Sequence, residues 1–240
     1  RNRRPVAEMI LERLPATILL TGSAFVLALL LGTALGVLAA AREGRWQDGA
    51  ITVVPLAFYA MPLFWVGLLM ILLFSAYLGW FPAFGMASFT ASGNAFARAL
   101  DTMWHLILPA FTLGLFYVAT YARLARASIL EVKHQDFIRT ARAKGLPPGR
   151  ILRAHMLRNA LLPVITFAGI QAGQLVGGAV VVETVFAWPG IGRLALDGLL
   201  QRDYNLLMGV FLLSAVMVMV INLLTDVLYR VADPRVRAGA

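Results

Sequence analysis

The chain has 240 residues, of which 60% are hydrophobic and 14% charged, and its mean hydropathy is +0.78. A soluble domain has roughly 25% charged residues, so this composition indicates an integral membrane protein. The net charge of +9 does not indicate a nucleic-acid-binding protein, because the cations lie in loops between apolar runs. The absence of cysteine excludes disulfides, Fe–S ligation and thiolate metal sites.

Five apolar segments are long enough to cross a bilayer, which takes about 20 residues. In chain order they cover residues 16–41, 50–79, 103–122, 161–186 and 206–229. We expect each to be one helix. This includes the second, because neighbouring helices can satisfy the backbone groups freed by Pro55 and Pro62. The prediction is an all-α integral membrane fold in which residues 1–240 form a single domain.

Small and polar residues inside these spans predict how the helices pack. Glycines at a spacing of four residues allow two helices to approach closely, and they recur in the first span (Gly32, Gly36) and the fourth (Gly169, Gly173, Gly177). Three amide side chains also lie in the spans: Gln171, Gln174 and Asn222. These amides either line a polar translocation pathway or form hydrogen bonds between helices, and both interpretations remain open.

The loop charges predict the orientation of the spans. The loops after spans one and three and the C-terminal tail contain fourteen Lys and Arg residues, and the alternate loops contain three. By the positive-inside rule, the side with fourteen is cytoplasmic. The N-terminal segment, with four arginines up to Arg13, would then lie outside. We therefore expect one more helix upstream, which would give six spans with both ends inside.

The basic segment at about 123–160 is predicted to be a cytoplasmic loop with its own structure. Asp136 can cap a helix over 137–144, whose apolar stripe includes Phe137 and Ile138. Gly145 follows where a helix end requires a left-handed residue, and the next two prolines prevent continuation. Further arginines such as Arg150 are consistent with a role in topology and lipid binding. A capped helix, however, goes beyond what topology requires.

The stretch DFIRTARAKGL (136–146) resembles the EAA loop of binding-protein-dependent ABC importer permeases, in the form found in the dipeptide/oligopeptide/nickel branch. Ala141 and Gly145 match the general motif. Arg139 and Thr140 depart from it, and Arg158 stands where its proline is expected. Four other stretches resemble the same branch: RPVAEMILERLPAT (4–17), LGWFPAFG (78–85), VVVETVFAWPGIGRL (180–194) and DPRVR (233–237).

This resemblance implies the transmembrane subunit of a type I ABC importer that moves peptides or a related small solute inward. It implies a second permease subunit, two ATPase subunits on the cytoplasmic side and an extracytoplasmic substrate-binding protein. The membrane would be the cytoplasmic (inner) membrane of a bacterium or archaeon. The residues that it assigns to coupling with the ATPase are Asp136, Phe137, Ile138, Arg139, Thr140, Ala141, Arg142, Ala143, Lys144 and Gly145.

The residues predict no chemistry of the chain's own. It lacks the G-x-x-x-x-G-K-[ST] phosphate loop, so we expect ATP and Mg²⁺ to be bound by partner subunits, with no cofactor here. The three histidines show no ligand spacing, and no metal site or catalytic residue is predicted. The alternative is a secondary, ion-coupled transporter. Such transporters usually have ionisable groups near the midplane, whereas Glu183 and the other candidates here lie near span ends.

Overall fold

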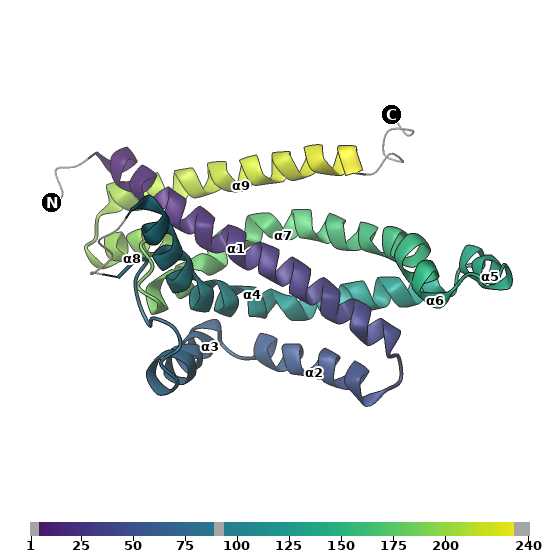
Figure 1. The fold of residues 1–240 in the computed structure, drawn as a ribbon. Helices are drawn as coiled ribbons and strands as arrows, with labels where there is room; N and C mark the ends of the chain where they lie inside the picture. Colours follow the sequence, from purple (N-terminus) through teal and green to yellow (C-terminus); the bar gives the residue numbers. More distant parts are fainter. Residues whose placement is uncertain (1–4, 89–93, 233–240) are drawn as a thin grey trace.

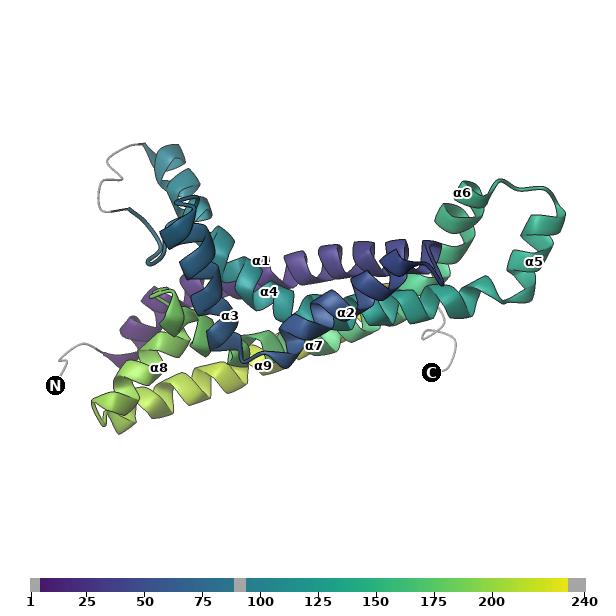
Figure 2. The same cartoon turned by 90° about the horizontal axis from the view of Figure 1, so that it is seen from below.

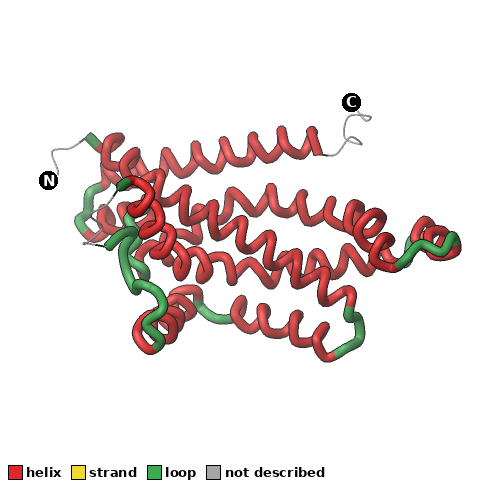
Figure 3. The backbone as a smooth tube through the Cα atoms, viewed as in Figure 1, coloured by secondary structure: helices red, strands yellow, loops and turns green. Residues whose placement is uncertain are grey.

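The computed structural model describes the backbone of residues 5–88 and 94–232, with every side chain in these ranges except those of 172–178, 224–226 and 228–232. All regular elements in these ranges are helices, and they form an elongated bundle (Figure 3). The bundle has one end at α5 and the other at α8 (Figure 1). These are called the α5 end and the α8 end below.

The bundle is built around α1 (Val6–Ala41) and α4 (Ala95–Lys133), which run side by side (Figures 1 and 2). At 1.5 Å per residue, their 36 and 39 residues span about 54 and 58 Å. A Cβ on Gly32 would lie 2.6 Å from the Tyr121 Cβ, and one on Gly36 would lie 2.5 Å from the Ala122 carbonyl oxygen. These glycines of the first span therefore lie where the two helices approach most closely.

Helix α4 continues beyond its predicted span of 103–122 in both directions. Its N-cap is Asn94, whose side chain accepts a hydrogen bond from the Ala97 N–H at 3.0 Å. Beyond residue 122, Ala125, Ile129 and Val132 stay buried at helical spacing, which keeps the helix attached to the bundle up to Lys133. The first part of the predicted basic loop, residues 123–133, is thus a rigid extension of α4.

The second predicted span is not one helix, which corrects the expectation for residues 50–79. Helix α2 (Trp46–Ala60) ends at Met61, and α3 (Leu63–Met70) continues into the π-helix η1 (Ile71–Tyr77) at an angle of 106° to α2. Pro62 has no N–H to donate and disfavours the helical conformation at Met61, which is extended with φ −85° and ψ 146°. Pro55, by contrast, is tolerated inside α2.

The remaining helices are α7 (Leu157–Val185), which covers the fourth predicted span, α8 (Ile191–Leu200) and α9 (Tyr204–Ala232). Helix α8 is an amphipathic helix that we did not predict between spans four and five. By length and composition, α1, α4 and the described part of α9 can cross a membrane, and the bent α2–α3 pair is a fourth candidate.

At the α5 end, a short helical hairpin projects beyond the bundle (Figure 2). It consists of α5 (Asp136–Ala143), the turn at Gly145, α6 (Pro148–Arg150) and the π-helix η2 (Ile151–Met156), which leads directly into α7. Because Pro147 and Pro148 prevent α5 from continuing, the chain turns back toward the bundle. The result is a small basic helix held away from the spans.

Candidate functional site

Helix α5 is anchored to the bundle through one apolar face. Ile138 is completely buried and Ala141 is 6% exposed. Both belong to a cluster at the ends of α1, α4 and α7, which we call the anchor cluster: Ala40, Ile129, Val132, Ile138, Ala141, Ile151, Met156 and Ala160. Because α5 has only eight residues, it depends on this contact for its stability.

The outward face of α5 is basic and solvent-accessible. Arg139, Arg142 and Lys144 are exposed, and Phe137, on the side of α5 that faces α4 and α7, remains 40% exposed. An ion pair on this helix joins Arg139 to Asp136 at 3.5 Å, and both side chains are highly exposed, so it adds little stability. Ala141 faces the bundle, so it cannot be part of the outward surface.

The C-terminal end of α5 is closed by a Schellman motif. The Gly145 N–H donates to the Arg142 carbonyl at 2.9 Å, and the Leu146 N–H donates to the Ala141 carbonyl at 3.3 Å. Gly145 is left-handed, with φ +74°, as the sequence predicts. A Cβ on Gly145 would meet no atom within 4 Å. The requirement for glycine there therefore comes from the backbone conformation alone.

The N-terminal end of α5 differs from the prediction. Asp136 is the first helical residue, and the N-cap is Gln135, whose side chain makes no capping hydrogen bond. The Asp136 carboxylate instead lies in the first turn, where the helix dipole favours negative charge. Its backbone carbonyl accepts a hydrogen bond from the Thr140 hydroxyl at 3.0 Å. The start of α5 is thus held less firmly than its end.

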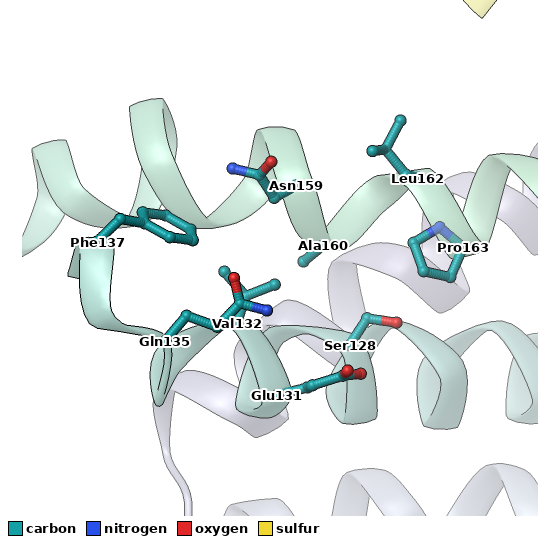
Figure 4. Close-up of a pocket in the computed structure, with 9 residues that line it drawn as sticks. All are labelled: Ser128, Glu131, Val132, Gln135, Phe137, Asn159, Ala160, Leu162 and Pro163. Atoms are coloured by element: carbon teal, nitrogen blue, oxygen red, sulfur yellow. The ribbon is translucent and has the colours of Figure 1, made fainter. Parts of the chain in front are cut away.

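A pocket of about 500 Å³ separates the start of α5 from α4 and α7 (Figure 4). Its lining residues come from the end of α4, the first turn of α5 and the beginning of α7: Ser128, Glu131, Val132, Gln135, Phe137, Asn159, Ala160, Leu162 and Pro163. The pocket leaves Phe137 free on one side, so this turn of α5 has room to shift against the bundle.

Two ion pairs join the α1–α2 connection to α4 near the anchor cluster. Asp48 is buried, and it accepts from Arg126 Nε at 2.6 Å and from a terminal guanidinium nitrogen at 2.7 Å. Glu43 accepts from Lys133 Nζ at 2.5 Å in a more exposed position. This hydrogen bond, aided by the charge of Lys133, holds the pKa of the Glu43 carboxyl below its usual range. Both contacts tie α2 to the helix that leads into α5.

At the α8 end, the chain is held by a buried carboxylate. Glu183 is completely buried in the last turns of α7. Its Oε1 accepts from the Thr17 hydroxyl at 2.6 Å, and its Oε2 accepts from the Arg193 N–H at 3.0 Å. The Ile191 N–H donates to the Thr17 hydroxyl at 2.8 Å. These contacts, called the Glu183 clasp below, join α1, α7 and the positive N-terminal end of α8.

The turn between α7 and α8 completes the clasp. The Trp188 side chain is fully buried, and its indole N–H donates to the Ala16 carbonyl at 2.8 Å. The Trp188 backbone N–H donates to the Glu183 carbonyl at 2.8 Å around Ala187, a non-glycine residue with φ +51°. A Cβ on Gly190 would lie 2.1 Å from the Glu183 carboxylate. Only glycine therefore fits between the carboxylate and α8.

Two of the three amide side chains predicted inside the spans, those of Gln171 and Asn222, are described by the structure. Gln171 is buried in α7 beside Tyr117 of α4. Asn222 is exposed on α9. The side chain of Gln174 and the surroundings of Gly173 and Gly177 lie outside the described residues. Gly169 is partly buried in α7.

Sequence reasoning missed the Glu183 clasp and the Asp48–Arg126 pair. A signal for the first was present, because an acid next to an apolar span, followed by Pro189, Gly190 and Gly192, indicates a buried carboxylate facing a tight turn. No comparable signal marked Asp48, since its partner lies 78 residues away.

The bundle and its projecting helix define a class of protein, the transmembrane domain of a type I ABC importer. The fold is similar to that of a chain of the MetNI methionine ABC transporter in an inward-facing conformation. The TM-score is 0.75 at 19% identity, over 96% of this chain and 99% of that one. A chain of an amino acid ABC transporter gives a TM-score of 0.65 at 14% identity, over 93% and 94%. At these identities the likeness concerns the fold alone.

The chain belongs to the family described as binding-protein-dependent transport system inner membrane component, whose model matches residues 32–238. It is 45% identical to the oligopeptide transport system permease protein AppB of Bacillus subtilis, over 98% of this chain and 73% of that protein. It is 40% identical to the dipeptide transport system permease protein DppB of Escherichia coli K12, over 99% and 75%. It is therefore a permease component of an ABC importer, and not a secondary transporter.

Proposed function

We propose that this chain is one of two permease subunits of a peptide importer in a bacterial cytoplasmic membrane. A substrate-binding protein delivers the peptide at the α8 end, and two ATPase subunits bind at the α5 end. The support for a peptide substrate is that relatives at 40–45% identity are named as oligopeptide and dipeptide permeases. ATP and Mg²⁺ are bound by the ATPase subunits, since this sequence has no phosphate loop.

The observation that carries this proposal is the position of α5. It projects at one end of the bundle (Figure 2) and exposes three cations, while the half-exposed Phe137 lies on its pocket side. Such a helix can enter a cleft of a partner, where Phe137 supplies apolar contact and the cations meet acidic groups. We assign contact with the ATPase to residues 136–145, with Ile138 and Ala141 anchoring the helix from behind.

Movement of α5 would reach the spans through the anchor cluster. Ile138 and Ala141 pack in the same cluster as Ala40 of α1, Ile129 of α4 and Ala160 of α7. Because packed interiors transmit displacement and compress little, a shift of α5 must move the ends of these helices or break the cluster. Closure of the ATPase pair therefore supplies the motion that opens the permease to the other side.

Reconstitution of the complete transporter tests this function. The chain is purified with the subunits that accompany it, placed in vesicles and supplied with binding protein, ATP and labelled di- and oligopeptides. We expect two ATPase subunits and one further permease per copy of this chain, together with ATP-dependent peptide accumulation. A complex that lacks an ATPase, or one that accumulates no peptide, would contradict the proposal.

The orientation is tested by cysteine labelling, since the chain has no cysteine of its own. Arg142→Cys on α5 is expected to be protected from an impermeant thiol reagent in intact cells. Trp80→Cys is expected to react, because this exposed residue lies in the segment that bonds to the α8 end through Gly85 and Phe186. The reverse pattern would place α5 outside and exclude its contact with a cytoplasmic ATPase.

A further inference from the structure

The break between α2 and α3 lies at the depth of the membrane interior. Helix α2 has 15 residues, so the break is about 22 Å from Trp46 along the helix. The hydrocarbon core is about 30 Å thick, and Trp46 follows directly on the charged α1–α2 connection. Because Asp48 pairs with Arg126 beyond the predicted span 103–122 of α4, the chain enters the hydrocarbon after Asp48. It reaches Met61 within about 20 Å, before it could leave on the other side.

Backbone polar groups are left without partners at this break. Among the described residues, neither the carbonyls of Tyr59 and Ala60 nor the amides of Leu63 and Phe64 have a hydrogen-bond partner. Ala60 is exposed on the surface of the chain. Broken helices occur at this depth only where protein buries the break or where it lines a water-filled cavity, because lipid offers no hydrogen bonds.

Polar aromatic side chains extend from the break into the bundle. Tyr59 stacks on Phe116 of α4, with ring centroids 4.8 Å apart, and Phe116 meets Tyr117 edge-on at 5.3 Å. Tyr117 lies in turn beside Gln171, near the middle of α7. Three helices thus contribute to one wall. We call Tyr59, Phe116, Tyr117 and Gln171 the aromatic wall.

We propose that the α2–α3 break and the aromatic wall line the water-filled pathway along which the solute crosses the membrane. The free carbonyls and amides at the break offer acceptors and donors side by side, which matches the alternating donors and acceptors of a peptide backbone. The aromatic faces accept side chains of varied size, because stacking and apolar contact are sequence-tolerant. The identity of the solute as a peptide rests on the proposed function, whereas the water-filled break rests on the geometry alone.

The alternative is that the second permease subunit covers the break and satisfies its backbone groups. The two arrangements differ in whether water reaches Ala60 in the assembled transporter. An exposed apolar position at a similar distance from the α5 end provides the comparison. Val26 on α1 is 52% exposed and lies 15 residues before Ala41, where α1 ends. Ala60 lies at a similar distance from the α1–α2 connection, because it is the last of the 15 residues of α2.

The test places single cysteines at these two positions in the reconstituted transporter. Ala60→Cys and Val26→Cys both put a small side chain at an exposed site of a chain without other cysteines, so neither is expected to disturb folding. A polar, charged thiol reagent is added from each side in turn. We expect at least a tenfold faster reaction at Ala60→Cys, slowed severalfold when transported peptide and binding protein are both present.

Equal, slow labelling at the two positions would overturn the pathway, as would rapid labelling that peptide leaves unchanged. A cross-link from Ala60→Cys to the second permease without labelling would overturn it too and assign the break to the subunit interface. Peptide uptake by the cysteine-free parent is measured in the same vesicles. If the parent fails to accumulate peptide, the proposed function is wrong. Labelling by the small thiol reagent would still show whether water reaches the α2–α3 break.

Discussion

The two ends of the bundle hold their short helices in different ways. At the α8 end, the Glu183 clasp fixes α8 to α1 and α7 through a fully buried carboxylate whose bonds converge from Thr17 and Arg193. At the α5 end, α5 rests on the anchor cluster, with a pocket on one side and an exposed ion pair on the other. A buried polar network has one good geometry, whereas the first turn of α5 has a pocket beside it and no such network to fix it.

The same backbone motif makes this difference clear. Both α5 and α7 end in a Schellman turn, around Gly145 and around Ala187. A left-handed alanine costs roughly 1 kcal/mol relative to glycine. The α8 end therefore keeps a strained residue because the clasp holds its geometry, whereas the α5 end relies on glycine. We infer that the α8 end is the fixed frame and the α5 end the adjustable part.

The largest effect is expected at the clasp. In Gly190→Ala, the new Cβ would lie 2.1 Å from the Glu183 carboxylate, and the φ of −97° at this position is otherwise suitable for alanine. Relief of the clash must separate the buried carboxylate from its donors, which costs on the order of 2–4 kcal/mol. Denaturant unfolding of the purified transporter measures this loss.

The control for that substitution is Gly149→Ala at the α5 end. A Cβ on Gly149 meets nothing within 4 Å, and the residue lies at the start of a helix. We expect its free energy of unfolding to remain within about 0.5 kcal/mol of the parent. If both alanine variants were equally stable, the view of the clasp as a rigid frame would be wrong.

An intermediate effect is expected at the pair between Asp48 and Arg126. Asp48→Ala removes both hydrogen bonds from the guanidinium and the one from the Gly44 N–H. We expect a loss of about 1–3 kcal/mol, because bonds to charged groups in a partly buried site are stronger than exposed ones. The double variant Asp48→Ala with Arg126→Ala completes a mutant cycle, and additive effects would show that the pair contributes nothing.

A smaller effect on stability, with a large effect on transport, is expected at Gly145. Gly145→Val forces a β-branched residue into the left-handed conformation at a cost of roughly 1–2 kcal/mol, with no clash. The variant is expected to accumulate in the membrane, while peptide uptake and peptide-stimulated ATP hydrolysis fall together several-fold. The assay uses the reconstituted transporter.

Two controls distinguish the effect of the left-handed backbone at Gly145 from the effects of adding a side chain or of changing the charge nearby. Gly145→Asn keeps most activity, since asparagine tolerates the left-handed region. Arg150→Gln, on the exposed α6, changes charge without touching the turn and is expected to have a mild effect. Full activity of Gly145→Val would indicate that α5 is only a basic topological segment.

The smallest effect is expected at the exposed pair of Glu43 and Lys133. Because Lys133 lowers the pKa of the Glu43 carboxyl, the pair contributes stability above the pKa of the unfolded chain. That contribution is lost as the pH falls through the lowered pKa of the folded state. Thermal unfolding of the parent and of Glu43→Gln should differ slightly at neutral pH, and the difference should vanish in acid and in high salt. A difference that persisted in acid would assign the effect to another contact.

Much of this fold could be predicted from the sequence, because it depends on interactions between residues that are close together in the chain. Runs of apolar residues can satisfy their backbone groups in lipid only as helices, and every predicted span except the second is one helix in the structure. The short basic helix and its turn were predictable because Gly145, Pro147 and Pro148 restrict the backbone within a few residues. The resemblance to the EAA loop could be recognised for the same reason, since it depends on one continuous stretch of residues.

Only the tertiary structure decided which distant residues meet. Thr17 and Glu183 are 166 residues apart, and their hydrogen bond depends on how α1, α7 and α8 pack around one buried carboxylate. Pro62 illustrates the same limit, because a proline in an apolar run is compatible with either a tolerated kink or a break. Neighbouring helices determine whether the freed backbone groups find partners. Among the residues that the structure describes, these groups find no partner, and the helix turns by 106°.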